Sequence, residues 1–451
     1  MSVSIVVCAA SHAYAQDTVD SITDPRAVGR AGTTTVSGDS GMTLLTNPGG
    51  MVRRSGARLL LSASLGDVDT TYEAAGSTLS PVIVNRPANA ATPMVAYHQG
   101  NEEGTWVLGA LFIVRNSEIA MPTPSFGQPK DDVARLFPHR YGGTQWQRES
   151  RRLGVGGAIR IGESIGLGAS ASLGQVRLRE SRRLWGGFAG RDQLLDSDLD
   201  LALRLTGQDS YNPGASLGAL VAPPEIPLEF ALAAEFRRGQ EFRSGPLALE
   251  ATSINNAPQP LLSDASASLR LASNYDLRTG VRYLGERVFV ELGAELAYVR
   301  SDQARSWSIE GVEVADRISG LRREVTHVGA LVSQRTRMAF RGAVDYEALA
   351  GFLWVTGGYA YQSPGSSRSR HNPGFARLGG HTVAIGLESA FEDFLITLGY
   401  ARHIERSRSV SAETSGMDVV NPFDSGTAPA NAGRYRQSSD QLGFAVEIGF
   451  Q

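Results

Sequence analysis

The stretch QLGFAVEIGFQ, residues 441–451, alternates apolar side chains with small or charged ones over its whole length. Successive side chains of a strand point to opposite sides, so one face is apolar (Leu442, Phe444, Val446, Ile448 and Phe450) and the other is not (Gly443, Ala445, Glu447 and Gly449). Residues 228–237 and 288–298 repeat the pattern. A soluble sandwich alternates too. Here, however, one face stays apolar for about ten residues while the other carries charges and glycines, which is typical of strands that face lipid on one side.

Connection lengths give an independent indication of the same fold. About fourteen such strands can be placed, an even number that lets a bacterial barrel close with both chain ends on one side. Short links near residues 100–104, 162–164, 222–227, 284–287, 347–350 and 391–393 alternate with long polar segments. The sequence therefore predicts an all-β fold, a transmembrane antiparallel β-barrel of about 14 strands with short turns at one end and long loops at the other.

Composition removes several classes of function. The net charge of -3 offers no basic field for nucleic acid, and the longest apolar run, TWVLGALFIV at 105–114, is half the length of a membrane helix. No HExxH or GxxxxGK[ST] motif occurs. We therefore expect no enzyme, no metal and no cofactor, although a barrel lipase or protease that gathers its residues from distant strands stays open.

The first residues resemble a secretory signal. An apolar stretch ends in Ala13-Tyr14-Ala15, a small-x-small motif that predicts cleavage between Ala15 and Gln16; the alternative is an ordinary buried segment. Cys8, the single cysteine, lies in this segment, so the mature chain would have no thiol chemistry. We expect a signal peptide at 1–15, a plug or hatch at 16–56 and a barrel at 57–451, because a barrel of this size has a lumen too wide for its own side chains to fill.

The predicted hatch carries a resemblance to a known family. AVGRAGTTTVSGDSGMTLLTNPGGM (27–51) and LTGQDSYNPGASLGALVAP (205–223) resemble the hatch and sixth strand of the outer-membrane long-chain fatty acid transport proteins, the FadL family. The sequence departs from the family at Gly49, where Ala is usual. The resemblance implies a luminal hatch, hydrophobic substrates, and a third strand that kinks inward to open a lateral exit. Gly109 is the candidate for that kink.

Four hatch residues form a predicted turn. Asn47, Pro48, Gly49 and Gly50 can extend neither a helix nor a strand, and we expect them to tie the hatch to the barrel wall. A plain connector with no role in transport is the alternative.

Two groups of arginines are candidate binding sites. Arg270, Arg278 and Arg282 should line the lumen on the eighth strand, which is expected to start near Asp264, with Arg278 opposite Gly293 and diagonal to Glu291 and Glu295. They form either a structural ion-pair ladder or a site for a substrate carboxylate. The second group lies at the outer rim of the fourth and fifth strands and would bind lipopolysaccharide phosphates or pair locally with Glu149 and Glu180; its members are Arg148, Arg151, Arg152, Arg177, Arg179, Arg182 and Arg183.

These patterns predict passive uptake of hydrophobic compounds, long-chain fatty acids or hydrocarbons, with lateral release into the membrane. We expect a monomer in the bacterial outer membrane with both termini periplasmic, in contact with membrane lipid and lipopolysaccharide. A polar-solute porin and a barrel enzyme are the rival functions. A porin would have an open lumen without a plug.

Overall fold

A closed ring of strands forms the body of the protein. The computed structural model describes residues 23–75, 83–84, 89–101, 103–121, 139–187, 197–244, 247–252, 258–299, 304–333, 335–371, 379–417, 419, 423 and 429–450. Within them, 14 antiparallel strands pair in sequence, and the last pairs with the first from Ala57↔Phe450 to Ala74↔Gly433. A closed ring lets neighbouring strands satisfy each other's backbone hydrogen-bonding groups. The predicted barrel and its strand number are confirmed.

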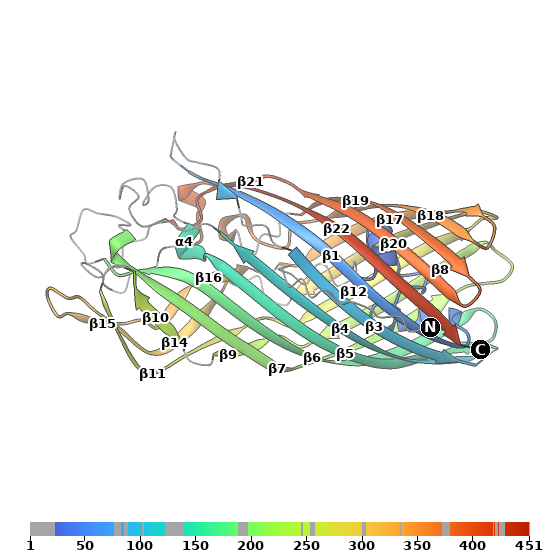
Figure 1. Ribbon diagram of the computed structural model, residues 1–451, viewed down its shortest axis with the longest axis horizontal. Helices are drawn as coiled ribbons and strands as arrows, with labels where there is room; N and C mark the ends of the chain where they lie inside the picture. The colour runs from blue at the N-terminus through green and yellow to red at the C-terminus, as the bar shows by residue number, and fades with distance from the viewer. Residues whose placement is uncertain are drawn as a thin grey trace, which may run out of the picture.

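The wall strands are tilted and long (Figure 1). They are β1 (Ala57–Ala74), β3 (Asn89–Gly100), β4 (Trp106–Ala120), β5 (Gln145–Ile161), β6 (Ile165–Trp185), β7 (Asp200–Val221), β8 (Leu228–Arg237), β12 (Asn274–Leu284), β13 (Val288–Val299), β17 (Arg337–Leu349), β18 (Leu353–Gln362), β19 (Gly380–Phe391), β20 (Phe394–Glu405) and β22 (Gly433–Phe450). The short turns lie at one end, together with the C-terminus (Figure 1). We call this the short-turn end and the opposite one the long-loop end.

The long-loop end contains further strands beyond the 14 of the wall. β9 (Glu241–Ser244), β10 (Ala248–Ala251), β11 (Gln259–Arg270), β14 (Ala304–Ala315), β15 (Arg322–Glu324) and β16 (His327–Ser333) extend the sheet beyond β7, and β2 (Ile83–Val84) and β21 (Arg408–Val410) add short pairs to β1 and β22. The extension buries its own apolar core, which includes Leu203, Phe242 and Trp307.

The predicted eighth strand is wrong in position. It was expected to start near Asp264, but Asp264 lies in β11, which pairs with β9 and β14 and not with a wall strand. A register shift between Leu262 and Ser266 and a positive φ at Asp264 mark a bulge there. The eighth wall strand is β12, which begins at Asn274.

An apolar belt surrounds the outside of the wall. Exposed large apolar side chains include Leu108, Val155, Leu217, Leu292 and Ile385, which lie on strands around the ring. Trp106 and Phe352 near the short turns, and Tyr298, Tyr359 and Tyr400 nearer the long loops, are all exposed, as an aromatic girdle requires. No helix among the described residues is long and apolar enough to cross a membrane.

Residues 23–56, which we call the hatch, lie inside the ring. They form α1 (Pro25–Gly29), α2 (Thr43–Thr46) and the 3₁₀ helix η2 (Pro48–Arg53). The remaining short helices are α4 (His139–Gly142), η3 (Ser197–Leu199), η4 (Arg368–Arg370) and η6 (Ala412–Thr414). The predicted signal peptide and residues 16–22 of the predicted hatch fall outside the described residues.

Candidate functional site: the hatch, the wall around it and a seam

The hatch meets the wall on every side. All 14 wall strands supply a residue that hydrogen-bonds to the hatch, forms an ion pair with it or leaves room for its backbone or side chains. In strand order these are Ser64, His98, Arg115, Arg160, Gly168, Ser216, Glu229, Gly280, Glu291, Asp345, Gly358, Glu388, Gly399 and Glu447. The hatch therefore extends across the whole lumen near the short-turn end.

Ion pairs hold the hatch to the wall. Arg26 contacts Glu388 at 2.9 Å, and the fully buried Arg30 contacts Glu291 at 2.8 Å and Asp345 at 3.3 Å. Glu291 also accepts hydrogen bonds from the backbone N–H groups of residues 36 and 37. Removing one partner of such a buried pair is costly, because the other charge stays behind unpaired.

Two further arginines complete this hatch–wall ion-pair set. Arg53 pairs with Glu229, and Arg54 lies 3.3 Å from Glu447. The four hatch arginines thus meet carboxylates on β8, β13, β17, β19 and β22. Sequence reasoning missed them. Their signal was the contrast between a hatch with four arginines and wall strands whose inward faces carry acids.

Charge also organises the hatch itself. Burial alone would raise the pKa of Asp39, but Arg26 at 3.0 Å and the nearby Arg30 hold that pKa well below its usual value. The Asp24 carboxylate caps α1 by accepting from the Arg26 N–H at 2.8 Å, and it also accepts from Ser40 Oγ at 3.0 Å. These bonds fold the segment back on itself.

The predicted turn lies against the wall. Pro48 opens η2, and the Asn47 side chain donates to the Thr35 carbonyl at 2.7 Å, so the turn joins two parts of the hatch. A Cβ added at Gly49 would come within 2.6 Å of the Gly218 carbonyl oxygen on β7. The glycine that departs from the family pattern is therefore the residue that allows this close approach.

Gly49→Ala should loosen the turn. The added methyl group meets backbone on β7, which cannot rotate away, so we expect a cost of about 1–3 kcal/mol to hatch docking. Limited proteolysis or hydrogen exchange of residues 23–56 measures the effect. Gly357→Ala is the matched control, because nothing lies within 4 Å of a Cβ at Gly357. Equal protection of the hatch in both variants would contradict the role given to Gly49.

Only some of the luminal glycines of β6 lie against the hatch. A Cβ at Gly166 would meet the Gly49 carbonyl at 2.5 Å, and one at Gly168 would clash with Pro48. Gly174, in contrast, faces Asn212 beside a bulge between β6 and β7. The hatch therefore packs against the short-turn half of β6.

The inner face of β4 is apolar because it meets the hatch. Val107, Leu111 and Ile113 are almost fully buried and belong to one cluster with Met94 of β3 and Met51 of the hatch. Gly109, the candidate kink, lies in an uninterrupted part of β4 between His98 and Gly156. A Cβ there would be 2.7 Å from Met51 Cε. In this structure Gly109 makes room for the hatch and does not break the strand.

The β3–β4 ladder ends early. Within the described residues, its pairs run from Gly100↔Val107 to Met94↔Ile113, whereas β4 continues to pair with β5 up to Ala120↔Gln145. The next residue of β3 is Pro93, which has no N–H to donate. Residues 89–93 and 114–120 therefore form an unpaired seam in the wall.

The hatch lies directly behind this seam. Continuing the register would place Thr92 opposite Arg115. At this level the Thr23 carbonyl accepts from Ser64 Oγ at 2.6 Å, and Thr23 Oγ1 accepts from Arg115 Nη2 at 3.0 Å. Ser64 itself pairs with Thr92. Thr23 thus bridges β1 and β4 from inside, across the place where β3 and β4 do not join.

The luminal arginines lie in a buried charge layer. Arg278 contacts Glu235 at 3.0 Å, Asp276 at 3.3 Å and Glu295 at 3.9 Å. Its direct partner on β13 is Glu295 and not Gly293, because the hairpin turn lies one residue later than expected, with Leu284 opposite Phe289. These contacts are those expected for a structural ion-pair ladder, the first of the two alternatives given for this group.

The other two members of that group differ in position. Arg282 lies inside the ring, 3.7 Å from Asp345, with its guanidinium over the Phe289 ring at 5.3 Å. Arg270 was expected in the lumen, but it lies on β11, its side chain is 76% exposed, and it pairs with Glu241. It is excluded from the luminal group because β11 is not a wall strand.

The predicted rim arginines divide between the two faces of the wall. Arg151, Arg177 and Arg179 are exposed on the outer face, whereas Arg152 reaches Glu235 in the lumen at 3.5 Å and Arg182 is buried against Glu180. Arg148 and Arg183 are half-buried. The prediction of one belt of seven is corrected, since alternation places neighbouring residues on opposite faces.

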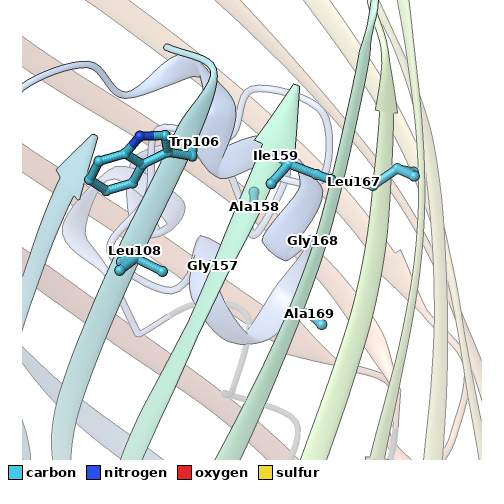
Figure 2. Close-up of a pocket in the computed structure, with 8 residues that line it drawn as sticks. All are labelled: Trp106, Leu108, Gly157, Ala158, Ile159, Leu167, Gly168 and Ala169. Carbon is cyan, nitrogen blue, oxygen red and sulfur yellow. The ribbon is translucent and has the colours of Figure 1, made fainter. Parts of the chain in front are cut away.

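A hollow of about 700 Å³ lies on the outer surface of β4, β5 and β6. Figure 2 shows Trp106 and Leu108, with Ile159 and Leu167, around a floor of small residues such as Gly157, and the hatch ribbon behind the wall. The β4–β5 and β5–β6 ladders continue through this region. The hollow is therefore a depression in the apolar belt and not a passage.

Tyr72, Tyr435 and His371 form a buried cluster at the long-loop end. The rings of Tyr72 on β1 and Tyr435 on β22 pack in a tilted arrangement with centroids 4.9 Å apart, and the His371 ring lies edge-on to Tyr435 at 4.5 Å. His371 is fully buried, and burial, with a smaller effect of Arg408, lowers its pKa to about 3. It is therefore neutral in the folded protein at any moderate pH.

Acid should loosen this cluster. Between pH 6.5 and 3 an unfolded His371 binds a proton that the folded one excludes, so stability falls as pH falls, by up to about 1.4 kcal/mol per pH unit. We expect the amide hydrogens of residues 429–437 to exchange faster at pH 5 than the pH dependence of the intrinsic exchange rate accounts for. His371→Gln should reduce this pH dependence, and His327→Gln, at an exposed site, should leave it intact. The opposite ranking would refute the assignment.

Comparisons with known proteins agree on the fold. No protein-family model matches the chain, and no curated protein sequence matches it. Among solved structures, a Pseudomonas aeruginosa FadL homologue superposes with a TM-score of 0.68 at 13% identity, covering 95% of this chain and 98% of the other. The P. putida toluene transporter TodX gives 0.62 at 15% identity with the same coverages.

A third structure behaves in the same way. The Ralstonia pickettii toluene transporter TbuX gives a TM-score of 0.63 at 12% identity, with 95% and 98% of the two chains covered. The fold expected from the FadL resemblance is confirmed by these matches. Among the described residues, no group of three or more His, Cys, Asp or Glu side chains is arranged to hold a metal ion.

Proposed function

We propose that this protein is an outer-membrane channel for the passive uptake of hydrophobic compounds, such as long-chain fatty acids or hydrocarbons. The observation that carries the proposal is the apolar contact between the hatch and the inner faces of β3 and β4, which lies beside the unpaired seam. A polar-solute porin has no need of either feature. The fold shared with a FadL homologue and with two toluene transporters supports the same function.

The finer part of the proposal is lateral release. A hydrophobic solute that passes the polar outer region of the membrane gains free energy by entering the hydrocarbon core and not the aqueous periplasm. The seam begins at Pro93 and Val114, and the outward residues just below it, Val95 and Phe112, belong to the apolar belt. Movement of Thr23 away from Ser64 and Arg115 would open a path from the lumen into the membrane.

A substrate carboxylate has a candidate position above the hatch. Arg152, Arg237, Arg278 and Arg341 share the three carboxylates of Glu235, Asp276 and Glu295. These guanidinium groups lie close together in one layer, so a substrate carboxylate would meet several possible partners there. Arg282, lower in the lumen, is the second candidate.

Uptake into proteoliposomes tests the function. We expect labelled oleate or toluene to equilibrate faster with protein than without it, while swelling in sugars stays at the protein-free rate. Swelling with sugars would favour the porin. Turnover of an ester or peptide substrate would favour the enzyme, and lack of hydrophobic uptake with a folded barrel would contradict the proposal.

A further inference from the structure

Arginines gather on the outer surface of one side of the barrel. Arg151 of β5 and Arg177 and Arg179 of β6 are followed around the wall by Arg204 of β7, Arg243 of β9 and Arg270 of β11, all exposed. We call these six residues the arginine patch. Side-chain exposure reaches 78% at Arg243, so the guanidinium groups are available to a ligand.

Strand register joins the patch into one surface. Glu149 of β5 lies opposite Arg177, Arg177 opposite Gln208 of β7, and Gln208 opposite Arg243. Neighbouring strands are about 4.8 Å apart, so this row crosses four strands within reach of a single large headgroup. Two rows further toward the long loops on the same face, Arg204 lies opposite Ser181.

The patch carries an excess of positive charge. Among the described residues, three carboxylates contact it: Glu149 pairs with Arg151 at 2.6 Å, Glu241 lies between Arg243 and Arg270, and Glu250 is 3.9 Å from Arg204. Six guanidinium groups therefore face three carboxylates. The whole chain has a net charge of -3, so the local excess is not a consequence of a basic protein.

The charge balance differs around the barrel. Near the first and last strands, exposed acids and arginines are interleaved: Glu73 of β1 lies opposite Arg434 of β22, and Arg402 of β20 is 3.4 Å from Asp440. In the arginine patch, by contrast, six guanidinium groups are accompanied by three contacting carboxylates among the described residues. This excess indicates that the arginine patch has a partner of its own, and that the partner is an anion.

The position of the patch identifies the kind of anion. On the same outward faces, toward the short-turn end, Leu153 follows Arg151 and Leu173 precedes Arg177, and both side chains are about half exposed in the apolar belt. A ligand that contacts both zones has anionic groups at the membrane surface and acyl chains below. Arginine suits phosphate because its planar guanidinium binds two oxygens at once.

We propose that the arginine patch binds the phosphate groups of a phosphorylated lipid in the external leaflet, which in an outer membrane is lipopolysaccharide. This site goes beyond the transport function and does not depend on it, because it lies on the outside of the wall. It would fix the orientation of the β5–β11 side against the most rigid part of the membrane.

Binding of purified lipid A to the full-length barrel in detergent tests the site, with native mass spectrometry as the readout. The variant R151Q/R177Q/R179Q should lower affinity at least about tenfold, since each basic residue near an anionic surface contributes measurably. The matched control R402Q/R434Q/R436Q removes three exposed arginines from β20 and β22 and should change affinity less than about twofold.

Two further probes distinguish the possible ligands. Dephosphorylated lipid A should bind the unaltered protein as weakly as phosphorylated lipid A binds the patch variant. Millimolar inorganic phosphate should not compete; effective competition would mean that the site takes free phosphate and would overturn the proposal. Equal binding of lipid A by the patch variant and the control would overturn it as well. Oleate uptake should be the same in both variants, so a failure here is separate from a failure of the transport function.

Discussion

Joining β3 to β4 across the seam should stop uptake of hydrophobic compounds. Pro93 and Val114 follow the last pair of the ladder, Met94↔Ile113, and would face each other if it continued. With Cys8 in the predicted signal peptide, the mature chain has no other thiol, so a Pro93→Cys/Val114→Cys pair can be cross-linked selectively. If the solute leaves between these strands, oxidation or a short bismaleimide should reduce oleate uptake at least about tenfold, because the gating motion is blocked.

The control introduces a cysteine pair between two wall strands that are already hydrogen-bonded to each other. Val155 of β5 and Ala171 of β6 are directly paired and both face outward. Cross-linking Val155→Cys to Ala171→Cys should leave uptake unchanged, and reduction should restore it in the seam variant. Undiminished uptake through a fully cross-linked seam would show that the solute leaves by another route.

The sequence was sufficient to predict the strands of the barrel wall, but not the additional strands at the long-loop end. Alternation at 441–451 and 228–237, with short and long links in turn, predicted the strands and the end at which they turn, because one face of each strand meets lipid. The same rule cannot separate a wall strand from a strand of the extension at the long-loop end. β11 alternates in the same way over part of its length, and Asp264 was therefore assigned to the wall.

The site was less predictable than the fold. Period-two reasoning correctly placed Glu229, Glu291 and Glu447 on inward faces, but their partners are hatch arginines that lie far away in the sequence, such as Arg30, which is 261 residues from Glu291. The sequence likewise does not reveal the seam, because the seam depends on where the β3–β4 ladder ends and not on which residues follow. Pro93 was its only local sign.

Removing the first part of the hatch should turn the channel into a leak. Deletion of residues 16–36 takes away α1, Arg26, Arg30 and Thr23, and with them the contacts to β13, β17 and β19 and the bridge behind the seam. The wall should stay folded, since its own hydrogen bonds close on themselves. Single-channel conductance should rise from near zero to a steady open level, and sugars should then cause liposome swelling.

A second variant separates obstruction from attachment. Arg26→Gln/Arg30→Gln keeps the chain in the lumen but removes the charges that meet Glu388, Glu291 and Asp345. Each lost buried pair costs about 3–5 kcal/mol, so the hatch should undock transiently and give brief openings in place of a steady level. Heat-dependent mobility on a gel reports whether both barrels are folded. Unchanged conductance in the folded deletion variant would mean that residues 16–36 do not obstruct the lumen. Steady opening in the charge variant would mean that the ion pairs, and not the packing of α1 against β19, β20 and β22, hold the hatch in place.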